Sequence, residues 1–242
     1  MSTFLSDLLN NDLSVILAGV LGGFLGLLLS YKLIGKMIRM IGTATGEISS
    51  FLSEERVEIA GKADAQTTIQ SPITKTSCVL WQVAVAERRS SGKSSHWVTV
   101  FSDTSVAPFD VYDGTGRVRV YPSRKMEIFL KDDVKKSSGV FYSLDEQTQT
   151  ALSELGVNTK GLLGLNKSMR VQERYLQQGD QVYLLGRILS NREGKVMDTD
   201  SPLVVSDHSE LRLLGKFAGQ VFLNVLIGIV SGAALAFFFI NR

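Results

Sequence analysis

Two long stretches without a charged side chain constrain the fold of this sequence more than any other feature. They cover residues 13–31 and 217–241 and are 19 and 25 residues long. As α-helices they would measure about 28 Å and 37 Å, and the hydrocarbon core of a bilayer is about 30 Å thick. A helix in the core of a soluble protein is rarely apolar on every side over such a length. The sequence therefore predicts two transmembrane helices.

The residues beside these stretches predict whether the first is cleaved and how both are oriented in the membrane. The first follows Asp7 and Asp12 without a Lys or Arg, and no small-x-small site closes it, so we expect a retained anchor rather than a cleaved signal peptide. Basic residues lie at the inner edges: Lys32, Lys36 and Arg39 after the first stretch, and Arg212 and Lys216 before the second. Because Lys and Arg favour the cytoplasmic side, the segment between is expected to face the cytoplasm.

Both stretches carry small residues at four-residue spacing. They are Gly19, Gly22, Gly23 and Gly26 in the first stretch, and Gly228 and Gly232 in the second. Small residues let helix backbones approach closely in lipid, which is a common route to helix association. We expect the first set to mediate homo-oligomerisation. The alternative is that it packs only against the chain's own second helix, through Gly228 and Gly232.

The chain between the stretches is predicted to be mainly β. We expect a short tail over 1–12, a transmembrane helix over 13–31, a juxtamembrane helix and connection over 32–55, a β-rich domain over 56–209, and the C-terminal transmembrane helix over 210–241. The β-rich segment consists of short runs of β-branched and aromatic residues separated by turn residues. A small β-barrel-like domain with one inserted helix fits this pattern best.

Local turn and cap signals place two hairpins and the inserted helix. Asp113-Gly114-Thr115-Gly116 joins two alternating runs, and we expect both glycines to have positive φ. A second hairpin is expected to turn over 191–194. Ser143 lies three residues before Glu146, which is the spacing of a capping box, and Gly156 is expected to end the helix.

Cysteine and histidine are too few for several kinds of site. Cys78 is the one cysteine, and His96 and His208 are the two histidines, so an internal disulfide is impossible and a Cys/His zinc site is nearly excluded. Cys78 and His96 could form a thiolate pair only if the fold joined them. We expect Cys78 to be a buried strand residue.

Two other motifs favour surface loops over ligand sites. Gly92-Lys93-Ser94 ends like a phosphate-binding loop, but Glu87 stands where that loop needs a glycine, so we expect a loop tip. The acidic residues Asp198, Asp200 and Asp207 lack the glycine-centred spacing of a calcium loop and are expected to be solvated. We therefore predict no catalytic, cofactor-binding or metal-binding residue and no cofactor.

Aromatic and basic residues raise the question of nucleic-acid binding. The aromatic residues are Trp81, Trp97, Phe109, Tyr112, Tyr121 and Tyr183, and the basic ones are Arg88, Arg89, Arg117, Arg119, Arg124 and Lys125. On a β-barrel they could bind bases if they shared one face. The chain has 26 basic and 24 acidic residues, which gives no general attraction to polyanions. Core packing explains the aromatic residues, so no nucleic-acid partner is expected.

Several segments, read in order, resemble a known domain. They are VEIAGKA at 57–63, SPITKTSCVLWQVAVAE at 71–87, Trp97, PFDVYDGTGRVRVYP at 108–122, RVQERYLQQGDQVYLLGRI at 170–188 and PLVVSDHSE at 202–210. Together they resemble the GIDE domain, also called the beside-a-membrane domain, of mitochondrial and plastid RING-type ubiquitin ligases and of prokaryotic membrane proteins. The resemblance covers about two thirds of the chain. It implies one domain between two membrane helices.

The resemblance implies an interaction role rather than ligase activity. A RING holds zinc through sets of four Cys or His ligands, and this chain has three such residues in all. We therefore expect an integral protein of a prokaryotic plasma membrane that presents a protein-interaction or scaffold domain to an unidentified membrane or membrane-proximal protein. The alternatives are a domain on the outer side, as in the mitochondrial relatives, a membrane-bound hydrolase or peptidase, and a nucleotide- or oligonucleotide-binding barrel.

Overall fold

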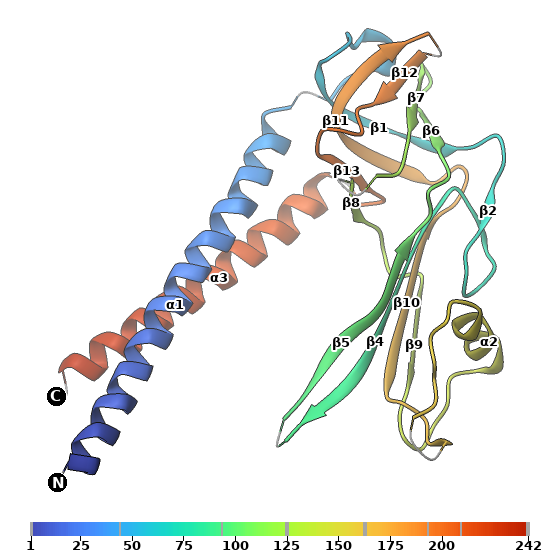
Figure 1. Cartoon of the computed structure of the whole chain (residues 1–242). Coiled ribbons are helices and arrows are strands. Elements are labelled where there is room, and N and C mark those ends of the chain that lie inside the picture. The colour runs from blue at the N-terminus through green and yellow to red at the C-terminus, as the bar shows by residue number, and fades with distance from the viewer. Residues whose placement is uncertain are drawn as a thin grey trace. The chain divides into compact units, whose positions relative to one another are not determined.

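A computed structural model of the chain shows two compact units (Figure 1). It describes residues 2–43, 45–92, 94–123, 126–161, 164–192, 194–208 and 210–240, and within these the backbone alone at 2–19, 39, 210–211 and 234–240. One unit consists of residues 1–43 together with 209–242, and the other of residues 44–208. The two ends of the chain thus belong to the same unit.

The first unit is a pair of long helices, α1 (Ser2–Ile41) and α3 (Glu210–Ile240), which pack against each other. Among the described side chains, the windows Val20–Ile38 and Arg212–Ala233 are long and apolar enough to cross a membrane. Two apolar helices at the ends of the chain were the helical part of the predicted fold class, and that part is confirmed.

Two glycines of α1 face α3 of the same chain. A Cβ added at Gly22 would lie 3.2 Å from Ser231 Oγ, and one at Gly26 would lie 2.9 Å from the backbone oxygen of Asn224. Gly228 and Gly232 have no atom within 4 Å of an added Cβ, so the alternative to homo-oligomerisation, a pairing through these two glycines, is wrong in that detail. The helices instead approach where glycine on α1 meets Asn224 and Ser231 on α3.

The second unit is rich in strands. Its elements are η1 (Ile48–Ser50), β1 (Arg56–Asp64), β2 (Ile69–Gln70), β3 (Ser77–Cys78), β4 (Leu80–Ser91), β5 (Ser94–Thr104), β6 (Phe109–Tyr112), β7 (Arg117–Val120), β8 (Met126–Phe129), β9 (Val134–Ser138), α2 (Glu146–Glu154), β10 (Met169–Leu176), β11 (Gln181–Asn191), β12 (Gly194–Met197) and β13 (Leu203–Ser206). The strands form a seven-stranded sheet, a four-stranded sheet and the short pair β2–β3.

Five strands of the larger sheet close into a barrel. Strand β1 pairs with β11 and β6, β6 pairs with β7, β7 pairs with β12, and β12 returns to β11. Strand β13 pairs with β11 and carries β8 at the edge of the sheet. Ile59, Phe109 and Leu184 lie in the buried core of this barrel. The predicted barrel is confirmed.

The four-stranded sheet, in the order β5-β4-β10-β9, was not predicted as a separate layer. Leu80 and Leu176, at one end of β4 and β10, belong to the barrel core, whereas Val85 and Val171 further along pack in a second core with Leu152 of α2. The two long strands therefore link the two cores. Runs of β-branched and aromatic residues indicated β4 and β5 but not β9, and they carried no information on which sheet a strand would join.

The inserted helix α2 is present, with a different N-cap from the predicted one. Asp145 is the N-cap, and its carboxylate accepts a hydrogen bond from the backbone N–H of Thr148 at 3.1 Å. Asp145 accepts this bond from the third helical residue, which leaves Ser143 outside the helix, so the predicted Ser143–Glu146 capping box is wrong. Gly156, with φ +73°, ends the helix as predicted.

Both predicted hairpins are confirmed, β6–β7 and β11–β12. In the first, Gly114 has φ +94° as expected, but Gly116 does not lie in the left-handed region. The reason is that Asp113 Oδ1 accepts the N–H groups of Thr115 at 2.8 Å and Gly116 at 3.0 Å, which closes the turn with a single positive φ among the two glycines. Gly116 is needed for space, because a Cβ there would lie 3.0 Å from Ile48 Cγ2.

Candidate functional site: a groove between two edge strands

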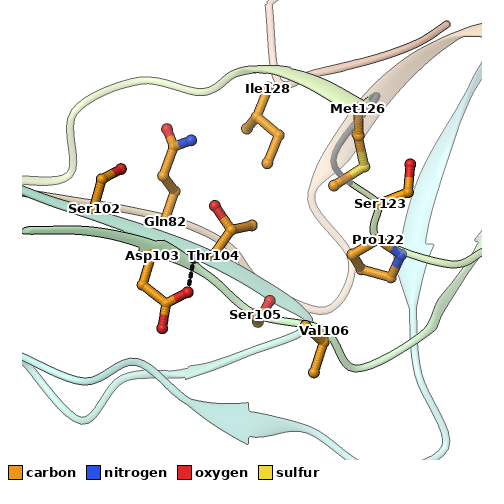
Figure 2. Close-up of a pocket in the computed structure, with 10 residues that line it drawn as sticks. All are labelled: Gln82, Ser102, Asp103, Thr104, Ser105, Val106, Pro122, Ser123, Met126 and Ile128. Carbon is orange, nitrogen blue, oxygen red and sulfur yellow. Dashed lines mark hydrogen bonds between the residues drawn. The ribbon is translucent and has the colours of Figure 1, made fainter.

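The β-rich unit contains an open groove of about 730 Å³ (Figure 2). One wall is formed by β4 and β5, the other by β8 and the segment after β7, and the floor by residues that follow β5. The lining residues are Gln82, Ser102, Asp103, Thr104, Ser105, Val106, Pro122, Ser123, Met126 and Ile128. The groove thus lies between the four-stranded sheet and the edge of the larger sheet.

The position of this groove is set by two edge strands. Strand β5 is the outermost strand of the four-stranded sheet, and β8 is the outermost strand of the larger sheet. An edge strand presents backbone N–H and C=O groups on its open side, where a further strand can pair. A groove between two such edges has the form needed to receive an extended polypeptide segment.

The polar side chains of the groove are held in place by specific partners. Ser105 Oγ accepts the backbone N–H of Trp81 at 3.1 Å, and Asp103 Oδ1 accepts the N–H of Thr104 at 2.8 Å. Gln82 Oε1 accepts a hydrogen bond from Arg174 Nη1 at 3.0 Å. This wall is therefore ordered before any partner binds, which lowers the entropy cost of binding.

Two side chains of the groove are in unfavourable surroundings in the chain by itself. The Ser123 hydroxyl oxygen is buried and has no hydrogen-bond partner among the described residues. A buried polar atom without a partner costs free energy, so such atoms often mark a place that a ligand satisfies. Val106 lies at the rim with 84% of its side chain exposed. A partner segment that covered Val106 and bonded to Ser123 would remove both costs.

The structure separates Cys78 from His96. Cys78 is buried in β3, next to the start of β4, whereas His96 pairs with Arg89 near the other end of β4. Arg89 lies nine positions after Leu80 along the strand, which corresponds to roughly 30 Å. Burial, followed by the charge of Glu173, raises the pKa of Cys78 to about 11. The thiol is therefore protonated at neutral pH and has no histidine partner.

The remaining motifs form turns. Gly92, with φ +60°, lies in the turn between β4 and β5, and Lys93 lies outside the described residues, so the segment is the expected loop tip. The carboxylate of Asp198 accepts the hydroxyl of Ser201 at 2.6 Å and the N–H of Asp200 at 2.8 Å. Asp207 instead pairs with Lys131. Within the described parts of the chain, no three His, Cys, Asp or Glu residues could hold a metal ion together.

The aromatic residues do not form one binding face. Phe109 and Tyr183 are buried, Trp81 packs against the second core, and Trp97 lies beneath the guanidinium of Arg170. Tyr112 is exposed, with Arg117 above its ring.

Four of the basic residues considered beside them are engaged elsewhere or not described. Arg119 donates to Asp110 at 2.8 Å, and Arg117 pairs with Asp64 at 2.8 Å. Arg124 and Lys125 lie outside the described residues. Arg88 and Arg89 lie in the β4–β5 hairpin, apart from the buried Phe109 and Tyr183. The described aromatic and basic residues therefore do not share one face, which the nucleotide-binding alternative requires.

Sequence reasoning missed every residue of the groove. Ser102, Thr104 and Ser123 belong to no motif, and polar residues near the ends of strands are common. The signal that could have helped is the polar character of β5 from Ser94 to Thr104, because a strand of this length with few apolar residues is typical of a sheet edge.

The chain thus consists of a barrel and an attached sheet, joined at both ends to long apolar helices. A family model named GIDE, described as E3 Ubiquitin ligase, matches residues 83–237. This match covers more than half of the 242 residues, so the chain belongs to the GIDE family. No curated protein and no solved structure matches the chain.

Proposed function

We propose that this protein is a two-span membrane protein whose β-rich domain binds an extended segment of another polypeptide in the groove between β5 and β8. The observation that carries the proposal is the meeting of two edge strands across a groove with preordered polar walls. Strand addition supplies backbone hydrogen bonds, and side-chain pockets such as the one near Ser123 supply selectivity. The two apolar helices and the family membership support the membrane location.

The proposed role is that of a scaffold rather than a ligase. The family model is described as E3 Ubiquitin ligase, but the residues of this chain include only Cys78, His96 and His208 as potential RING ligands. These three residues could not complete one four-ligand zinc site, and a RING needs more than one. Ubiquitin transfer by a RING would therefore need zinc ligands other than these three residues.

We also propose that the β-rich domain faces the cytoplasm of a prokaryotic cell and that the protein self-associates in the membrane. The basic flanks of both apolar stretches support the orientation. Because Gly22 and Gly26 already face α3, self-association would use Gly23, where an added Cβ has no atom within 4 Å. Gly19, one turn before Gly23, is described in its backbone only.

Site-specific photocrosslinking tests the groove. A benzoylphenylalanine at Val106 should form an adduct with a defined protein in native membranes, whereas the same residue at Ser153, exposed on α2, should not. Filling the groove by Ser123→Phe should remove the adduct at Val106 because the partner segment is displaced. The melting temperature of Ser123→Phe serves as the control for folding. An adduct that persists with the groove filled, or equal adducts at both sites, would contradict the proposal.

A further inference from the structure

Three turns meet at one end of the four-stranded sheet. The strand register aligns Val98 with Glu87, Glu87 with Met169, and Met169 with Ser138, so these residues form one row across the sheet. Beyond this row lie the end of the β4–β5 hairpin over 88–97, the turn over 139–142 that follows β9, and the loop over 158–168 that precedes β10, of which residues 93, 162 and 163 lie outside the described residues. We call these three segments the sheet tip. Figure 1 shows them at the same end of this sheet.

The sheet tip exposes large apolar side chains. Phe141 is 99% exposed, and Val140, Tyr142 and Leu165 are also exposed. The turn that carries the first three is well defined, because the N–H of Gly139 donates to the oxygen of Tyr142 at 3.0 Å and the reverse bond measures 3.2 Å. Val140 and Phe141 therefore occupy the two corners of a tight turn and point outward. Exposing several large apolar side chains together to water is unfavourable, and such a patch is typical of a surface that contacts a partner or a membrane.

Charge on the sheet tip has one sign. Its described residues include the basic Arg88, Arg89, Lys160 and Lys167 and no Asp or Glu, although the whole chain is nearly balanced. Glu87, in the adjoining row, pairs with Lys167 at 3.4 Å and with Arg89 at 3.8 Å, and Arg88 and Lys160 have no such acidic partner among the ion pairs of the described residues. Trp97 lies at the same end, with the guanidinium of Arg170 placed 3.9 Å from its ring centroid. Aromatic side chains among basic ones suit the interface of a membrane that carries anionic lipids, where rings enter the headgroup region and Lys or Arg bind phosphates.

We propose that the sheet tip is a lipid-docking surface that inserts Phe141 into the bilayer to which the chain is anchored. This inference rests on the proposed membrane anchoring. The two apolar helices hold the domain at a high effective concentration near that bilayer, so a single aromatic turn with a few basic neighbours suffices for contact. The alternative to lipid is a protein partner, which would be expected to carry acidic groups. The experiment below distinguishes a lipid contact from a protein contact.

An environment-sensitive fluorophore at position 141 tests the proposal in the full chain. The Phe141→Cys protein is labelled and placed as a single copy in nanodiscs of phosphatidylcholine, with or without phosphatidylglycerol. Wild type controls for labelling of the buried Cys78, and Val106→Cys is the matched control, since Val106 is also a highly exposed apolar residue and lies away from the sheet tip. We expect a blue shift and quenching by lipids with a spin label in the acyl chain at position 141 but not at position 106.

The result should depend on charge. Removing phosphatidylglycerol, or introducing Arg88→Gln, Arg89→Gln and Lys160→Gln together, should reduce the quenching at position 141 because the anionic attraction is lost. A label at position 141 that stays as wet as the one at 106 in both lipids would overturn the proposal. So would a label that is wet in nanodiscs and shielded only in native membranes, since a protein would then cover the turn. Failure to enter nanodiscs would contradict the membrane anchoring itself.

Discussion

Glu173 is a fully buried carboxylate that organises a turn far away in sequence. Its Oε1 accepts the N–H of Ile73 at 2.7 Å, and its Oε2 accepts the N–H of Thr74 at 3.1 Å and the Thr74 hydroxyl at 2.5 Å. A buried polar atom without a hydrogen-bond partner costs free energy, and these three donors satisfy both oxygens of the carboxyl group. Glu173 thus fixes the turn before β3 to strand β10, which no local sequence signal indicated.

Asp145 gives the clearest dependence of stability on pH. The ammonium of Lys136 at 2.9 Å, helped by the N–H and hydroxyl of Thr148, lowers the pKa of Asp145 to about 2. Because the folded pKa lies below the ordinary value of 3.8, the ionised carboxylate stabilises the fold above about pH 4, and this contribution is lost as the pH falls through 2. Asp145→Asn should therefore remove part of the loss of stability between pH 4 and 2, as measured by acid unfolding followed by circular dichroism.

Asparagine keeps the N-cap acceptor, so this substitution removes the charge and little else. Since the side chain is about half exposed, solvent screens the ion pair, and the cost of Asp145→Asn at neutral pH should stay below about 1 kcal/mol. Acid unfolding curves of equal steepness for the two proteins would show that Asp145 is not the group responsible.

Among the elements, α1 allows a matched pair of substitutions on neighbouring residues. Gly26→Ile should lower the melting temperature in mild detergent because its Cβ would lie 2.9 Å from the Asn224 oxygen, without changing the number of chains per particle. Gly23→Ile should leave the melting temperature nearly unchanged, because no atom lies within 4 Å of its Cβ, and it should dissociate the proposed oligomer. Light scattering measures the particle size. An oligomer that survives Gly23→Ile argues against that face.

The elements themselves were largely predictable, whereas their partners were not. The β6–β7 hairpin followed from Asp113 and Gly114, and the end of α2 followed from Gly156, because each depends on residues within a few positions. The contact of Gly116 with Ile48, and that of Gly26 with Asn224, joins residues far apart in the chain. The spacing of residue types along the sequence indicates the secondary structure of a segment. It does not indicate which distant residues the segment contacts. The groove belongs to this second kind, since its walls come from separate sheets.

For the whole molecule, the proposed orientation can be measured by labelling. A Ser153→Cys protein in intact cells should not react with an impermeant maleimide, and it should react once the cells are permeabilised, because the basic flanks predict a cytoplasmic β-rich domain. Ser153 is exposed on α2, and the native Cys78 is buried, so wild type reports the background. Labelling in intact cells would contradict the proposed orientation.

The pairing of α1 with α3 has a consequence for the synthesis of this protein. Between Ile41 and Glu210 the ribosome must make 168 residues before α3 begins. At about 5 to 20 residues per second this takes roughly 8 to 34 s. Throughout that time the glycine face of α1 is without its partner, and the barrel itself closes only late in this interval, because β1 pairs with β11. The glycine face of α1 is therefore covered only when α3, the last of the helices, has been synthesised.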